Sequence, residues 1–182
     1  VQVRNVGTIG GSLAHADPAA DYPAAMLVLG AELVAQSPGG RRTIAADEFF
    51  TGFFATALAP GELLVEIRIP AQHVGGAYLK FPHPASGFAV VGVAALAGIA
   101  GGTFEWARVG VNGVGPAGYR AMGVENALNG RPAAPETIAA AADHAADGVD
   151  VNEDIFAPAD YRAHLARVYT RRTLTLALER TR

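Results

Sequence analysis

Two long β-prone segments joined by a pair of glycines dominate the middle of the sequence. Residues 89–100 are apolar throughout and rich in valine, and residues 103–114 form the second segment. Gly101 and Gly102 lie between the two segments, and glycine reaches the positive φ angles that a tight hairpin turn requires. A third strand is expected over residues 77–81. Together these segments predict an antiparallel sheet.

Three helical segments are expected after the sheet. Residues 119–128 end at Asn129-Gly130, a pair that commonly terminates a helix, and residues 135–146 are rich in alanine. Residues 160–178 predict a longer helix whose apolar face is formed by Tyr161, Leu165, Val168, Tyr169 and Leu176. Three strands followed by three helices indicate an α+β domain, with the helices on one side of the sheet.

The first part of the chain contains shorter elements. Residues 24–29 predict a short helix that follows Asp21-Tyr22-Pro23 and ends at Gly30. The other expected elements are a hairpin of residues 31–36 and 41–45, a short helix over residues 47–54, and a strand over residues 63–69 whose buried face is Leu63, Val65, Ile67 and Ile69. A linker near residues 71–76 divides the chain into residues 1–73 and residues 74–182.

Composition excludes several classes of protein. Of the 182 residues, 51% are hydrophobic, which suffices for a buried core, and a net charge of −3 offers no positive field for nucleic acid. Cysteine is absent, so this chain supplies no disulfide, thiolate nucleophile or thiolate ligand for an iron–sulfur cluster. The longest apolar stretch is shorter than the roughly 20 residues that span a bilayer, and no signal peptide precedes it, so the cytoplasm is the default location.

A glycine-rich run near the start is the sharpest local signal. Residues 7–12 read Gly-Thr-Ile-Gly-Gly-Ser, and His15, Asp17 and Asp21 follow. Glycine lets a backbone approach a phosphate closely, so successive amides and a hydroxyl can hold its oxygens. The run is neither a dinucleotide fingerprint nor a Walker loop. Its chemistry alone leaves an anion site and an ordinary glycine turn both open, with the turn favoured.

The longer run over residues 8–24 resembles the second flavin-phosphate motif of the flavin subunits of molybdenum hydroxylases, such as the medium subunits of carbon monoxide and xanthine dehydrogenases. In that motif a Thr/Ser-x-Gly-Gly-Asn/Ser core precedes a spaced aspartate. The resemblance continues through residues 60–64, 69–70, 77–81, 83–90 and 169–172. It covers essentially the whole chain, and the order and spacing of these blocks are more specific than any single block.

The resemblance implies a fold and a set of cofactor contacts. Residues 1–73 would be the second half of a PCMH-type FAD-binding domain, and residues 74–182 a C-terminal α+β domain with a three-stranded antiparallel sheet and a three-helix bundle. The implied contacts to FAD are Thr8, Ile9, Gly10, Gly11 and Ser12 at the pyrophosphate, Asp21 and Leu64 near the dinucleotide, and Lys80 and Phe88 near the isoalloxazine.

Two of these contacts have ordinary alternatives. The Lys80 ammonium would favour an anionic reduced flavin, because an opposite charge stabilises developing negative charge, but a solvated strand lysine is equally compatible with the sequence. Phe88 stands where related subunits often carry tyrosine, and it is otherwise a core residue. No catalytic residue and no metal ligand is assigned, since the five histidines show no zinc-type spacing.

The same resemblance implies a role in electron transfer. The chain would pass electrons from [2Fe–2S] clusters on a small subunit to an external acceptor, which is NAD, quinone or oxygen. A molybdopterin-containing large subunit would oxidise the substrate, and the expected assembly is a dimer of heterotrimers, in the cytoplasm or at the inner face of the membrane.

The sequence departs from the family in one respect. Related subunits carry an earlier glycine-rich phosphate loop, and nothing before Val1 supplies it, so the chain is expected to be truncated at its N-terminus. Two alternatives to a flavin subunit therefore stay open. One is a flavin-free docking or assembly module, and the other is an unrelated nucleotide-binding module that uses residues 8–12.

Overall fold

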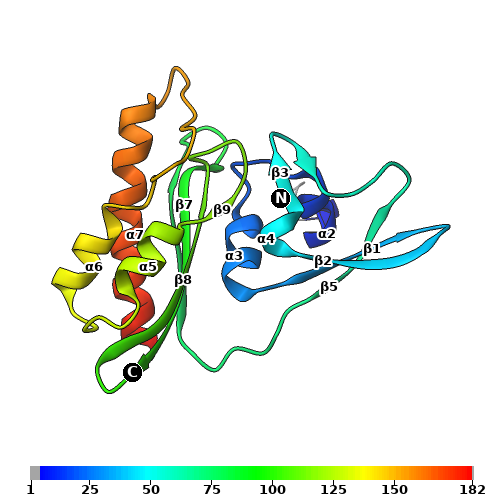
Figure 1. Ribbon diagram of the computed structural model, residues 1–182. Coiled ribbons are helices and arrows are strands. Elements are labelled where there is room, and N and C mark those ends of the chain that lie inside the picture. The colour runs from blue at the N-terminus through cyan, green and yellow to red at the C-terminus, as the bar shows by residue number, and fades with distance from the viewer. Residues whose placement is uncertain (1–4, 182) are drawn as a thin grey trace.

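A four-stranded antiparallel sheet forms the centre of the computed structural model, which describes residues 5–181 (Figure 1). Its strand order is β6-β7-β8-β9, with bounds β6 Gly76–Pro82, β7 Ala89–Ala100, β8 Thr103–Asn112 and β9 Tyr119–Arg120. The three predicted strands are confirmed, and both glycines of the β7–β8 turn have positive φ. The sequence pattern does not predict β9, because a two-residue strand is too short to show a periodicity. Its pairing with β8 delays the following helix to Met122.

Three helices cover one face of this sheet: α5 Met122–Leu128, α6 Pro135–Ala142 and α7 Ala159–Thr181 (Figure 1). The predicted α+β arrangement is confirmed. The buried side of α7 differs from the predicted stripe, however. Small residues and leucines fill it, including Leu165, Ala166 and Leu174, whereas Tyr161 is 40% exposed. Small side chains bring the long helix close to β7 and β6.

A fourth helix, α3 Asp21–Leu29, lies on the opposite face of the sheet (Figure 1). Ala24 and Val28 of α3 pack against Ala94 and Leu96 of β7. The approach is close, since a Cβ at Gly110 of β8 would lie 2.5 Å from the Ala24 carbonyl oxygen. The three predicted helices thus share one face as expected, and a helix from the first part of the chain covers the second face.

The rest of the first part forms a separate core. Strands β1 Glu32–Ser37, β2 Gly40–Ala45 and β5 Leu63–Arg68 make a three-stranded sheet in the order β2-β1-β5, which confirms the predicted hairpin and the following strand. The remaining elements are the helices α2 Ile9–His15 and α4 Ala46–Phe49 and the short strands β3 Phe50–Gly52 and β4 Ala55–Thr56. Leu13, Leu27, Leu33 and Phe49 are at the centre of this core.

Two expectations about these elements are wrong. The helix predicted over residues 47–54 stops at Phe49, because the next residues turn into β3 and pair with β4. In β5, a register shift opposite Val34 and Ala35 changes which side chains face inward. Leu64 and Ile67 pack on the core, while Leu63 is 70% exposed. Simple alternation fails here because the bulge interrupts it.

Within residues 5–181, no helix combines the length and the apolar character needed to cross a membrane.

Candidate functional site

The predicted phosphate-binding run forms the start of helix α2 rather than an open turn. Thr8 is the N-cap, and its Oγ1 accepts a hydrogen bond from the Gly11 amide at 2.9 Å. The Ser12 amide donates to the Thr8 carbonyl oxygen at 3.0 Å. Two of the amides in the run are therefore used by the fold itself, as is usual for a capped first turn.

The adjacent glycines of the run, Gly10 and Gly11, differ in what surrounds them. A Cβ at Gly11 would lie 2.9 Å from Thr8 Oγ1, so the N-cap geometry favours a residue without a side chain at this position. A Cβ at Gly10 would meet nothing within 4 Å, so packing does not require glycine there. Within residues 5–181, the amides of Ile9 and Gly10 donate no hydrogen bond to another residue of this part of the chain. These two open amides fit an approaching phosphate oxygen.

Two predicted site residues that are far apart in sequence come together in the structure. Asp21 is the first residue of α3, and Lys80 lies in β6. Lys80 Nζ is 2.7 Å from Asp21 Oδ2, and both side chains are partly exposed. The carboxylate offsets the ammonium charge, so Lys80 is not simply a solvated strand lysine.

Two residues that the sequence analysis missed complete this cluster. The Tyr78 hydroxyl donates to Asp21 Oδ1 at 2.6 Å, and Asn112 Oδ1 lies 3.4 Å from the same hydroxyl. Burial, followed by the hydrogen bond to Asp21, raises the pKa of the Tyr78 hydroxyl well above its usual value. Strand alternation was an available signal, because Tyr78 and Lys80 lie two positions apart and share a face of β6. Asn112 was also detectable as a polar residue in an apolar strand.

Phe88 lies in the loop before β7 and is 50% exposed, so it is not a core residue. The loop is ordered by backbone bonds: the His83 amide donates to the Phe88 carbonyl oxygen at 2.7 Å. The next amide, that of Ala89, donates to the Ala19 carbonyl oxygen at 3.1 Å. Phe88 is thereby tied to the segment between α2 and α3, and part of its ring surface stays open to a ligand.

Leu64 is set apart from the other predicted residues. It is half-buried on β5, where it pairs with Ala35 and packs into the core of the first part of the chain. The structure thus joins Asp21 to Lys80 directly and ties Phe88 to the loop between α2 and α3, but Leu64 belongs to a different layer.

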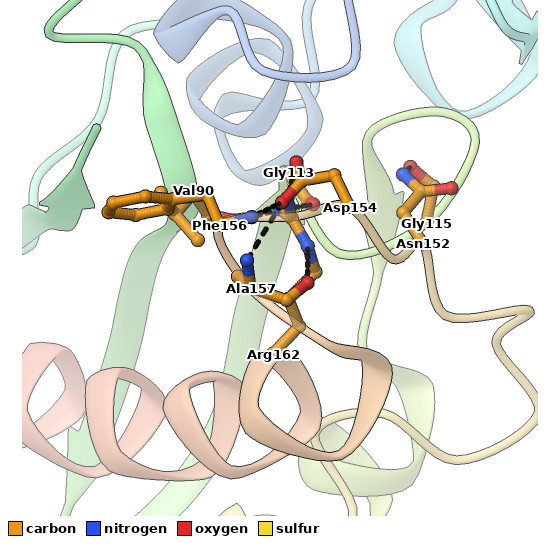
Figure 2. A network of polar contacts seen from close by, with 8 residues as sticks. All are labelled: Val90, Gly113, Gly115, Asn152, Asp154, Phe156, Ala157 and Arg162. Atoms are coloured by element: carbon orange, nitrogen blue, oxygen red, sulfur yellow. Dashed lines mark hydrogen bonds and ion pairs between the residues drawn. The ribbon is translucent and has the colours of Figure 1, made fainter. Parts of the chain in front are cut away.

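Arg162, near the start of α7, fixes the strand ends beside this region (Figure 2). Its Nη1 donates to the carbonyl oxygens of Val90 at 2.8 Å and Gly113 at 2.9 Å, and its Nη2 pairs with Asp154. The Gly113 amide donates to the Pro18 carbonyl oxygen at 2.7 Å. The buried guanidinium therefore supports the point where the segment between α2 and α3 is attached to the sheet.

A cavity of about 630 Å³ opens elsewhere, between the α4–β3 segment, the stretch over residues 116–123 that contains β9 and the start of α5, and the loop over residues 147–150. None of the nine predicted site residues lines it. Its guanidinium, that of Arg120, is already paired with Glu125 and Asp47. We therefore place the candidate site at Asp21 and the start of α2, where groups that bind ligands are unengaged or exposed.

Comparisons with known proteins agree with this placement of the elements. Residues 1–72 match the FAD binding domain in molybdopterin dehydrogenase, and residues 76–177 match the CO dehydrogenase flavoprotein C-terminal domain. The carbon monoxide dehydrogenase medium chain of Hydrogenophaga pseudoflava is 38% identical over 98% of this chain and 63% of its own length. The nicotine 6-hydroxylase medium subunit of Paenarthrobacter nicotinovorans is 36% identical over 99% of this chain and 64% of its own length.

Solved structures are also similar to this chain over its whole length. A carbon monoxide dehydrogenase structure from Hydrogenophaga pseudoflava, which lacks the Mo-pyranopterin moiety of the cofactor, superimposes with a TM-score of 0.94 at 39% identity. The match covers 100% of this chain and 64% of that chain. The present chain thus spans slightly less than two thirds of the length of these relatives.

Proposed function

Because the chain belongs to the CO dehydrogenase flavoprotein family, we propose that it forms the FAD-binding part of an oxidoreductase subunit, akin to the medium subunits of molybdenum hydroxylases. In this role it would hold FAD at the end of an electron-transfer chain. The redox chemistry belongs to the cofactor, which accepts electrons and hands them to an external acceptor when it is bound. The chain itself binds and orients it.

One observation carries this proposal: the 2.7 Å contact between Asp21 and Lys80. Each residue is expected to contact FAD, and they come from the two separately matched parts of the chain. A site that requires both parts therefore has its halves joined by an ion pair. Asp21 remains partly exposed, so it keeps lone pairs for a hydrogen-bond donor of the cofactor.

The other proposed contacts use amides, hydroxyls and an aromatic surface that are accessible to a ligand. The open amides of Ile9 and Gly10 would donate to the pyrophosphate, with the hydroxyls of Thr8 and Ser12 beside them. Phe88 offers an exposed ring surface for the isoalloxazine. Gly11 keeps the cap of α2 intact, and the proposed role of Leu64 is apolar contact with the dinucleotide.

The proposed partners are those of the relatives' class of enzyme. A molybdopterin-containing large subunit would oxidise the substrate, and a small subunit would carry the [2Fe–2S] clusters. Those clusters need thiolate ligands, and this sequence contains no cysteine to supply them. A dimer of heterotrimers is the proposed assembly.

Flavin binding by the protein, purified in the full length in which it is encoded, tests this function. We expect visible flavin absorbance in the wild type. In the double variant Thr8→Ala, Gly10→Ala we expect flavin to be lost, because the cap hydroxyl disappears and a methyl group occupies the space beside the open amides. Gly10→Ala alone should leave the melting temperature unchanged or higher, since its Cβ meets nothing within 4 Å.

Gly39→Ala is the matched control for this experiment. It makes the same chemical change at an exposed turn glycine whose added Cβ has only an ordinary contact, 3.5 Å from Ser37 Oγ. Flavin content should stay at the wild-type level in this variant. A colourless wild-type protein after incubation with FAD would contradict the function, and full flavin retention in the double variant would contradict the assignment of residues 8–12.

A further inference from the structure

We propose that Tyr78 and Asn112 are positioning residues that hold the Asp21 carboxylate in a fixed orientation toward the cofactor. This inference rests on the proposed function and extends it to residues that do not themselves face the ligand. Asp21 would present a preorganised acceptor to an N–H or O–H donor of the bound flavin nucleotide. The fold devotes three strands and one helix to this arrangement.

The hydrogen bonds that link Asn112, Tyr78 and Asp21 form a chain in which each side chain donates to the next. A tyrosine hydroxyl has a single proton, and the 2.6 Å contact to Asp21 Oδ1 uses it. Asn112 is fully buried, and within the described residues its Nδ2 has no partner. With the amide turned so that Nδ2 faces the hydroxyl, Asn112 donates to Tyr78 and Tyr78 donates to Asp21. This orientation gives the buried donor a partner.

A glycine on the intervening strand makes the contact possible. Gly92 of β7 is paired with Asn112 on one side and with Lys80 on the other. A Cβ at this position would overlap both the Tyr78 hydroxyl and the Asn112 amide. The two side chains therefore meet over a gap in β7 that only glycine leaves open.

Each oxygen of the Asp21 carboxylate accepts a hydrogen bond from a side chain of β6. Tyr78 holds Oδ1 and Lys80 holds Oδ2, while the Asp21 side chain as a whole is 42% exposed. Each carboxylate oxygen has a further lone pair, so the exposed side can still accept a hydrogen bond. Tyr78 stays protonated and donating across the physiological pH range, because burial raises the pKa of its hydroxyl. A carboxylate held in this way loses little conformational freedom when a ligand binds.

A double-mutant cycle on FAD affinity tests this arrangement. The full-length protein is stripped of flavin, and binding of added FAD is measured by the quenching of flavin fluorescence. Tyr78→Phe, which keeps the ring and removes the hydroxyl, should weaken FAD binding about tenfold in the wild-type background. In the Asp21→Ala background the same substitution should change the affinity less than about twofold, because the group on which it acts is absent.

Tyr119→Phe is the matched control. Tyr119 is also a largely buried tyrosine, and its hydroxyl donates to the Ala145 carbonyl oxygen at 2.9 Å, away from Asp21. We expect this variant to lower the melting temperature without changing FAD affinity. If Tyr78→Phe behaves in the same way, or weakens FAD binding equally in both backgrounds, the positioning role is wrong. Should Tyr78→Phe fail to fold, Asn112→Ala in the same two backgrounds decides the question by the same criterion.

The outcomes separate this inference from the function on which it rests. If Asp21→Ala weakens FAD binding but Tyr78→Phe does not, only the positioning role is overturned. If Asp21→Ala leaves FAD affinity unchanged, the assignment of Asp21 as a cofactor contact is overturned together with the positioning role. If the wild-type protein does not bind FAD at all, the proposed function itself fails.

Discussion

Glu62, which precedes β5, shows how one residue makes the fold sensitive to acid. Arg42 of β2 holds it through two hydrogen bonds of 2.7 Å, and the Ala59 amide donates to it at the same distance. The bonds from Arg42, and then the one from Ala59, lower the pKa of Glu62 from 4.5 to about 2. A lowered carboxylate pKa means that the folded chain releases this proton more readily than the unfolded chain does.

Glu62 contributes stability above about pH 4.5, and this contribution is lost as the pH falls toward 2, because the unfolded chain takes up the proton first. We therefore expect Glu62→Gln to flatten the loss of stability between pH 4.5 and 2. Urea midpoints measured across this range check it, with Glu153→Gln as a control at an exposed glutamate. A wild-type slope in Glu62→Gln would contradict the assignment.

At the scale of single elements, α7 acts through Arg162 as a clamp on two strands (Figure 2). Replacing Arg162 with methionine keeps an unbranched side chain but leaves the buried carbonyl oxygens of Val90 and Gly113 without this donor. We expect the free energy of unfolding to fall by roughly 3 kcal/mol, since a buried polar group without a partner costs about 1 to 3 kcal/mol. Urea denaturation measures this loss.

Arg167→Met is the control for the clamp. Arg167 is exposed on the same helix, so its loss should change stability by no more than about 0.5 kcal/mol. Equal effects of the two substitutions would show that the guanidinium of Arg162 holds nothing in place.

The regular elements were predictable and the clamp was not, for a physical reason. Strands β7 and β8 have continuous apolar patterns and a glycine turn, so local sequence determines them. Arg162 bonds to carbonyl oxygens 72 and 49 positions away, and a charged residue on a helix otherwise indicates an exposed position. The bulge in β5 and the short strand β9 depend in the same way on pairing partners rather than on local pattern.

The candidate site was predictable in its members but not in its contacts. The resemblance to flavin subunits indicates Asp21 and Lys80 separately, and their ion pair emerges only when α3 packs on the sheet. Tyr78 lies in one of the matched blocks and Asn112 lies outside them, but the resemblance assigns neither residue a cofactor contact. Their hydrogen-bond distances to each other and to Asp21 bring them into the site. The helical start of α2 also differs from the expected turn, because the Thr8 side chain caps it.

At the scale of the whole molecule, α3 couples the two parts of the chain that we propose to divide after residue 73. Trp106, the only tryptophan in the sequence, lies on β8 and packs against the apolar cluster that α3 and β7 form through Ala24, Val28, Ala94 and Leu96. We expect one cooperative unfolding transition, so that Trp106 fluorescence and far-ultraviolet circular dichroism change together in urea. A fluorescence change at clearly lower urea than the loss of ellipticity would contradict the coupling.

The close approach of Ala24 to Gly110 limits how chimaeras of these proteins can be built. A junction placed in the linker would join α3 from one parent to a sheet from another. Any parent with a larger residue than glycine at the position of Gly110 would then push the helix outward, and Asp21 would move with it away from Lys80. Exchanges between relatives should therefore transfer α3 together with the sheet that it covers.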